Sequence, residues 1–113
     1  MKKPQQKLTE NMTLREYQKY IKDLEAINGW DKDTYATKFV LFMEEVGELA
    51  KAMRKQEGLY TEKAKNDKNT RLNLEEEFAD VLNYFMDLAN KYEVDVITAC
   101  IRKDKENEKR TWD

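Results

Sequence analysis

The chain has 113 residues, which is enough for one domain with a modest core. Charged residues make up 39% of it, but the net charge is only −2, so the basic surface of a nucleic-acid-binding protein is not expected. No apolar run approaches the roughly 20 residues that a membrane span needs, and the polar N-terminus is unlike a secretory signal, so neither a membrane nor a nucleic-acid partner is predicted.

The first helix is predicted to run from about Thr13 to Asn28. Thr13 followed by Glu16 is a capping-box pattern, and Gly29 is a natural residue at which to end the helix. Residues 1–12 are polar and are interpreted as a lead-in that precedes the folded domain.

The second helix is predicted to start near Asp33 or Thr34 and to end before Gly58. The segment TEKAKNDKNTRLN that follows, residues 61–73, is polar throughout. This composition predicts a loop between the second and third helices.

The third helix is predicted to start at Asn73, with Glu76 as its capping partner, and to run to about Tyr92. A fourth helix should start near Asp95 and end near Lys109. Four helices with short connections predict an all-α fold, a four-helix antiparallel bundle formed by a single domain over residues 13–113.

Several aromatic side chains remain after one small bundle core is filled, and small domains are marginally stable alone. We therefore expect a homodimer or homotetramer, although a monomer with ordinary surface aromatics is the alternative. The aromatics in question are Tyr17, Tyr20, Trp30, Tyr35, Phe42 and Tyr84.

Two acidic pairs lie beside the apolar stripes of the second and third helices. On a helical wheel Glu45 falls within the apolar arc and Glu48 at its edge, and Glu77 and Asp80 repeat this arrangement on the third helix. If the two helices pack antiparallel through these stripes, four carboxylates converge at the rim of the core.

Converging carboxylates repel one another, and burying them is costly unless cations compensate. The chain has no histidine, which excludes Ser-His-Asp catalysis and ordinary zinc sites. An oxygen-only site favours Mg²⁺, with Mn²⁺ as a substitute. The alternatives are acids on solvated helix faces or acids paired with lysines.

The lone cysteine, Cys100, cannot form an internal disulfide, which fits a reducing cytoplasm. It lies in the small and apolar stretch VITACI, so a packed thiol is expected. No histidine exists to activate it as a nucleophile.

The stretches EEVGELAKAMRK (44–55) and EEEFADVLNYFMDLA (75–89) resemble the MazG-like all-α nucleoside triphosphate pyrophosphohydrolases, whose hallmark is Glu-x-x-Glu on one helix and Glu-x-x-Asp on the next. The resemblance covers roughly residues 14–112. It implies Mg²⁺-dependent hydrolysis of a (deoxy)nucleoside triphosphate to a monophosphate and pyrophosphate, with clearing of unwanted nucleotides as one role. It also implies a dimeric or tetrameric assembly.

On this resemblance the four acids hold Mg²⁺, and Glu45 is the candidate for activating the attacking water. Lys103, Asn107 and Arg110 match the family's Lys…Asn…Arg segment and would bind phosphate oxygens, unless they form only a solvated basic helix end.

Two further residues have weaker assignments. Lys38 lies on the Glu45 side of its helix and is a further phosphate candidate, and Trp30 is a candidate for stacking on the base. A tryptophan in the core or in an interface is an equal alternative for Trp30.

Two other functions remain open. One is a related dUTP or phosphoribosyl-ATP pyrophosphohydrolase that uses the same acids. The other is a non-catalytic helical interaction module with a regulatory nucleotide site, which would bind nucleotides without turnover.

Overall fold

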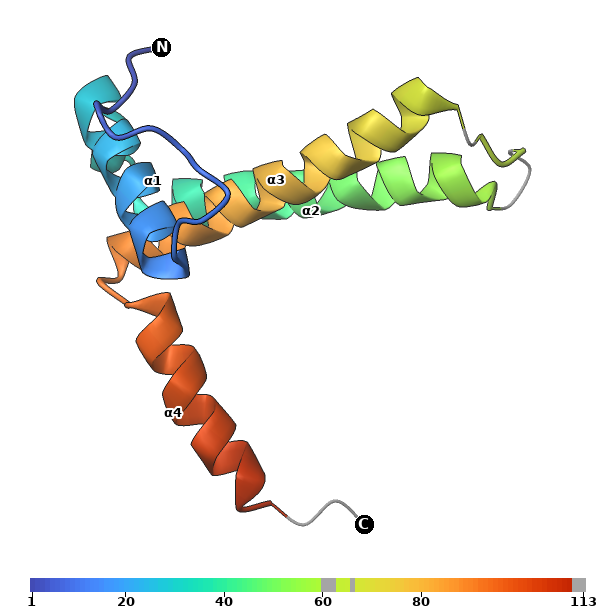
Figure 1. Ribbon diagram of the computed structural model, residues 1–113. Helices are drawn as coiled ribbons and strands as arrows, with labels where there is room; N and C mark the ends of the chain where they lie inside the picture. The colour runs from blue at the N-terminus through green and yellow to red at the C-terminus, as the bar shows by residue number, and fades with distance from the viewer. Residues whose placement is uncertain (60–62, 66, 111–113) are drawn as a thin grey trace. The chain divides into compact units, whose positions relative to one another are not determined.

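The computed structural model describes residues 1–59, 63–65 and 67–110, and within these ranges it is helical with no strand. The all-α class is confirmed. Among the described residues, no helix is both long and apolar enough to cross a membrane. The elements in chain order are α1 (Leu14–Asn28), the short 3₁₀ helix η1 (Trp30–Lys32), α2 (Tyr35–Glu57), α3 (Lys68–Lys91) and α4 (Val96–Glu108) (Figure 1).

The chain forms two compact units. The first comprises Met1–Lys32 together with Ala89–Asp113, and the second is Asp33–Leu88. Helix α3 runs from the second unit into the first.

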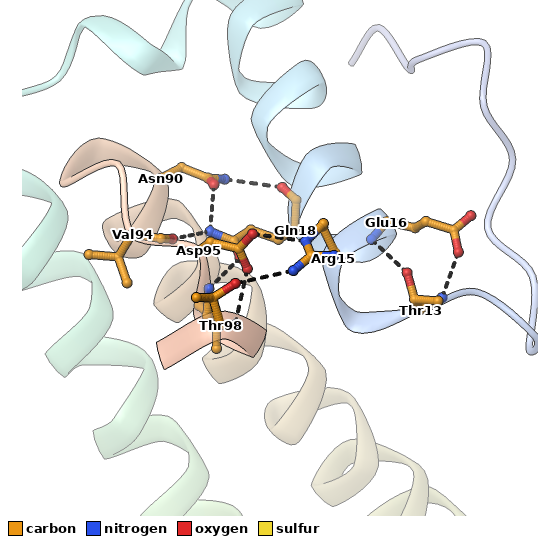
Figure 2. A network of polar contacts seen from close by, with 9 residues as sticks. Thr13, Arg15, Glu16, Gln18, Asn90, Val94, Asp95 and Thr98 are labelled. Atoms are coloured by element: carbon orange, nitrogen blue, oxygen red, sulfur yellow. Dashed lines mark hydrogen bonds and ion pairs between the residues drawn. The ribbon is translucent and has the colours of Figure 1, made fainter. Parts of the chain in front are cut away.

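Local capping sets the ends of α1, as predicted. The Thr13 hydroxyl accepts a hydrogen bond from the Glu16 amide at 3.1 Å, and the Glu16 carboxylate accepts one from the Thr13 amide at 2.9 Å (Figure 2). Gly29 ends the helix in the left-handed conformation, with φ of 73°. The capping box and the glycine stop are therefore confirmed.

Capping also defines α2. The Thr34 hydroxyl accepts from the Thr37 amide at 3.1 Å, and Gly58 ends the helix with φ of 69°. A side chain at Gly58 would collide with the backbone of Ala64, so the close return of the chain requires glycine there.

The predicted start of α3 was wrong. The helix begins at Lys68, not at Asn73, because the Asp67 carboxylate caps it by accepting a hydrogen bond from the Thr70 amide at 2.8 Å. The first turns are solvated and need no apolar face, so a polar sequence could not distinguish them from a loop. Residues 60–62 and 66 of the predicted loop lie outside the described residues.

In the first unit, Gln18 connects α1 to the turn between α3 and α4 (Figure 2). Its side-chain amide nitrogen donates to the Val94 carbonyl at 2.6 Å and to the Asn90 side-chain oxygen at 3.0 Å. Its side-chain oxygen accepts from the Val96 amide at 3.0 Å. Gln18 thereby satisfies a backbone amide at the start of α4 that the helix itself leaves unpaired.

Asp95 caps α4, as predicted, by accepting a hydrogen bond from the Thr98 amide at 3.3 Å. Arg15 forms an exposed ion pair with the same carboxylate at 2.8 Å. Tyr20, one of the aromatics expected to be in excess, is buried in the core of this unit together with Ile21 and Val96. Cys100, predicted to be packed, is instead exposed on α4.

The second unit is a helical hairpin in which α2 and the first part of α3 run side by side and antiparallel (Figure 1). The rings of Phe42 and Phe85 lie 6.2 Å apart, and Ala52 and Leu74 are buried nearer the tip. Residue numbers therefore rise on α2 as they fall on α3 along the contact. This register determines which acidic residues face one another.

Ten large apolar side chains of this hairpin remain 40–57% exposed, so the hairpin buries little of its own apolar surface. An apolar surface of this extent on a small protein commonly marks an association site. The side chains are Tyr35, Phe39, Val40, Met43, Met53, Leu59, Leu72, Phe78, Leu82 and Phe85, and we call this set the apolar face.

Candidate metal centre

Three acidic side chains of the hairpin meet between α2 and α3. Carboxylate oxygens of Glu45, Glu77 and Asp80 all lie within 4.8 Å of one another. Glu77 and Asp80 are three residues apart and share one face of α3, while Glu45 comes from the facing turn of α2. The antiparallel register thus brings together three of the four acids that the sequence singled out.

Glu48, the fourth acid, is exposed and is not part of this three-residue group. Its negative charge nevertheless raises the pKa of both Glu45 and Glu77, so it lies near them. Its place as a metal ligand stays a prediction.

The environment makes negative charge unfavourable at two of these acids. Burial raises the pKa of the Glu45 carboxyl above its usual value, and the charges of Asp80, Glu77, Glu48 and Glu44 raise it further. The pKa of Glu77 is also raised, first by burial and then by the neighbouring acids. In the metal-free protein these carboxylates repel one another, and repulsion of this kind favours a bound cation.

One buried oxygen of the cluster has no hydrogen-bond partner among the residues that the structure describes. This oxygen is Oε2 of Glu77. Over the same residues, no lysine or arginine forms an ion pair with Glu45, Glu48, Glu77 or Asp80. The alternative of lysine-paired acids therefore finds no support, and a buried carboxylate oxygen without a donor is the feature that a metal ion would satisfy.

The donor atoms determine which metal fits. All three clustered ligands are carboxylates, and the chain has no histidine. Hard divalent cations prefer oxygen ligands, so the residues present fit Mg²⁺ or Mn²⁺ better than zinc.

The predicted phosphate-binding residues Lys103 and Asn107 lie one turn apart on α4. Arg110 lies beyond the end of this helix, where its amide donates to the Asn107 carbonyl at 3.1 Å. Lys103 and Arg110 are exposed. These three residues belong to the first unit and the acids to the second, so their contact with a shared substrate stays a prediction.

Lys38 has a different environment from the one the sequence suggested. Its ammonium lies 2.6 Å from a carboxylate oxygen of Asp87 on α3, and its side chain is only 2% exposed. A phosphate role for Lys38 stays a prediction, but this burial argues against it. Sequence reasoning missed Asp87, although an acid within the apolar stretch YFMDLAN signals a buried partner.

Trp30 lies in η1 with 43% of its surface exposed. The role of Trp30 in stacking on the base stays a prediction.

Sequence reasoning also missed Gln18 and Asn90, whose hydrogen bonds connect α1 to the end of α3.

A known protein family matches most of the chain. The family model described as the MazG nucleotide pyrophosphohydrolase domain matches residues 33–111, well over half of the chain. The matched span includes both acidic pairs and all of the hairpin. No curated protein matches the chain.

Proposed function

The chain belongs to the family of MazG nucleotide pyrophosphohydrolases, and we propose that it cleaves a (deoxy)nucleoside triphosphate between the α and β phosphates in a Mg²⁺-dependent reaction. The products are a nucleoside monophosphate and pyrophosphate. The observation that carries the proposal is the cluster of three carboxylates in which a buried Glu77 oxygen has no hydrogen-bond donor among the described residues. The family match supports the reaction, and the cluster offers carboxylates that could hold the cation.

Glu45, Glu77 and Asp80 would hold the cation between α2 and α3, with Glu48 at the exposed side. Bound Mg²⁺ would offset the mutual repulsion of these acids and polarise the phosphate oxygens. Glu45 is our candidate for orienting or deprotonating the attacking water, because a carboxylate beside the bound cation can accept its proton.

Lys103, Asn107 and Arg110 would bind the triphosphate, with arginine as a two-pronged donor and lysine as a point charge. Lys103 on α4 and Arg110 just beyond its end are both exposed and therefore available to an anionic ligand. Trp30 would stack on the base. Clearing of unwanted nucleotides in the cytoplasm is the role we propose for this activity.

We also propose that the apolar face is covered by a second copy of the chain, giving a homodimer or homotetramer. Two exposed phenylalanines, Phe39 and Phe78, are each more than half exposed, and burying such side chains is the main driving force of association. Light scattering after gel filtration tests this, with Phe78→Ser expected to shift the mass toward the monomer. If the unmodified protein already has the mass of a monomer, the proposed assembly is refuted.

A coupled assay tests the activity. Pyrophosphate release is measured for each NTP and dNTP with Mg²⁺ and with a chelator, and inorganic pyrophosphatase converts the product to phosphate. We expect metal-dependent release that Glu45→Gln abolishes, whereas the matched change Glu44→Gln at the exposed neighbouring position leaves most of it. Binding without turnover for every nucleotide, dUTP included, would instead identify a non-catalytic module.

A further inference from the structure

The hairpin contains a buried ion pair that the proposed reaction does not use. Lys38 on α2 and Asp87 on α3 are 49 residues apart in sequence, and their charged atoms lie 2.6 Å apart. The two side chains are only 2% and 9% exposed, in contrast to ion pairs such as Arg15–Asp95, whose side chains are 62% and 42% exposed. A buried pair of this kind contributes little net stability, because desolvation offsets the attraction. Its geometry points to another role.

The ion pair and the acid cluster lie on the same side of both helices. Lys38 precedes Glu45 by seven residues, and Asp87 follows Asp80 by the same number. Seven residues make almost two full helical turns, about 10 Å along the axis, with a rotation of only about 20°. The pair and the metal-binding acids are therefore two contacts in one register between the same two helices.

Apolar contacts specify that register poorly. Ridges of side chains on packed helices recur at each turn, so a shift of about 5.4 Å exchanges one set of apolar contacts for a similar one. Such a shift would separate the Lys38 ammonium from the Asp87 carboxylate and so break a buried ion pair, which is strongly unfavourable. Polar groups in helical interfaces are known to specify register in this way.

The acids themselves oppose the observed register in the metal-free protein. Glu45, Glu77 and Asp80 repel one another at their observed separations. Some other contact must hold them together before a cation arrives.

We propose that the Lys38–Asp87 ion pair is a register lock that positions Glu45 against Glu77 and Asp80 and so preorganises the metal centre. Lys38 and Asp87 are then positioning residues, since neither belongs to the acid cluster. The proposal rests on the proposed metal-binding role of those acids. It also assigns to Lys38 a role other than phosphate binding.

The test replaces both charges with apolar groups of similar size, Lys38→Met with Asp87→Leu. Replacing a buried ion pair in this way usually preserves stability, whereas Asp87→Leu alone removes the carboxylate that faces a buried ammonium and should lower the melting temperature strongly. The control, Arg71→Gln with Glu75→Gln, removes an exposed ion pair within α3.

Two readouts separate positioning from folding. Mn²⁺ affinity, measured by electron paramagnetic resonance of the free ion, reports the metal centre. Spin labels introduced by Ala36→Cys and Lys68→Cys, in a Cys100→Ser background, report the register of the metal-free hairpin. The labels would lie about 30 Å apart along the hairpin, and a slip of one turn would change their distance by about 5 Å. Diluting the labelled protein with unlabelled protein suppresses the signal from pairs of labels on different copies of the chain.

We expect the double apolar variant to melt at or above the original temperature, to bind Mn²⁺ about tenfold more weakly or worse, and to show a shifted or broadened label distance. A folded double variant with unchanged Mn²⁺ affinity and unchanged label distance would overturn the proposal. If the unmodified protein binds no Mn²⁺, the proposed function fails, and the label distance in the double variant still decides whether the pair sets the register.

Discussion

Replacing Glu45 with glutamine should stabilise the metal-free protein and at the same time remove most of its response to Mg²⁺. The substitution keeps the size of the side chain and its place on α2 but removes a charge that burial and the neighbouring acids disfavour. A residue kept only for folding would not show these opposite effects.

The size of the first effect follows from the cluster geometry. The oxygens of Glu45, Glu77 and Asp80 lie within 4.8 Å of one another. With the dielectric constant of water, each pair of charges at this distance costs about 0.9 kcal/mol, and salt screening reduces this to about 0.5 kcal/mol. Removing two such repulsions should raise the free energy of unfolding by about 1 kcal/mol. For a chain of 113 residues this corresponds to a melting temperature higher by about 4 °C.

The second effect follows from mass action. A Mg²⁺ concentration of 100 times Kd stabilises the native state by about 2.7 kcal/mol, or roughly 11 °C for a chain of this size. If Glu45→Gln weakens binding by about 10- to 100-fold, the same concentration should raise the melting temperature by only about 2–6 °C. Without metal, Glu45→Gln should therefore have the higher melting temperature, and as Mg²⁺ is added the melting temperature of the unmodified protein should overtake it.

Calorimetry at fixed protein concentration, with chelator and with increasing Mg²⁺, measures both effects. Glu44→Gln is the matched control, because it removes the same charge from the neighbouring exposed position and should keep most of the Mg²⁺ response. A Glu45→Gln protein that melts at or below the unmodified temperature without metal, or that retains the full Mg²⁺ shift, would refute this reasoning.

Three other measurements test the site. Asp80→Asn should abolish Mg²⁺-dependent pyrophosphate release while circular dichroism shows unchanged helicity, and full activity would remove this residue from the metal centre. Lys103→Ala should mainly raise KM for triphosphates, with Lys105→Ala on the same helix as control, and an unchanged KM would exclude a phosphate contact. Because the native pKa of Glu45 and of Glu77 is raised above the usual 4.5, the folded protein holds extra protons, and metal-free stability should fall as pH rises from 4.5 through the raised values. The free energy of unfolding of the unmodified protein minus that of Glu45→Gln should therefore fall over this pH range without metal, and this fall should disappear with saturating Mg²⁺. A difference, taken in this order, that rose with pH in the metal-free proteins would contradict the reasoning.

Much of the fold followed from short-range sequence signals. Thr13 with Glu16, and the glycines at 29 and 58, marked helix ends correctly, because each cap is formed by residues within a few positions of one another. The start of α3 was missed, because its cap, Asp67, stands in a polar run in which a helix and a loop have similar composition.

The candidate site was predicted in part, again from short-range signals. Acids three residues apart on one helix must share a face, so Glu77 and Asp80 could be grouped from spacing alone. Spacing could not show that Glu48 would stand apart from the group, nor that the oxygen left buried without a partner would belong to Glu77.

The sequence by itself determined the helices, most of their ends and the side of its helix on which each acidic pair lies. These features depend on helical periodicity and on caps formed within one turn. Only the tertiary structure decided which acids meet and which carboxylate receives Lys38, since those contacts join residues tens of positions apart. They depend on the register between two antiparallel helices. That register is set by burial and charge pairing across the interface, and these are not properties of either helix alone.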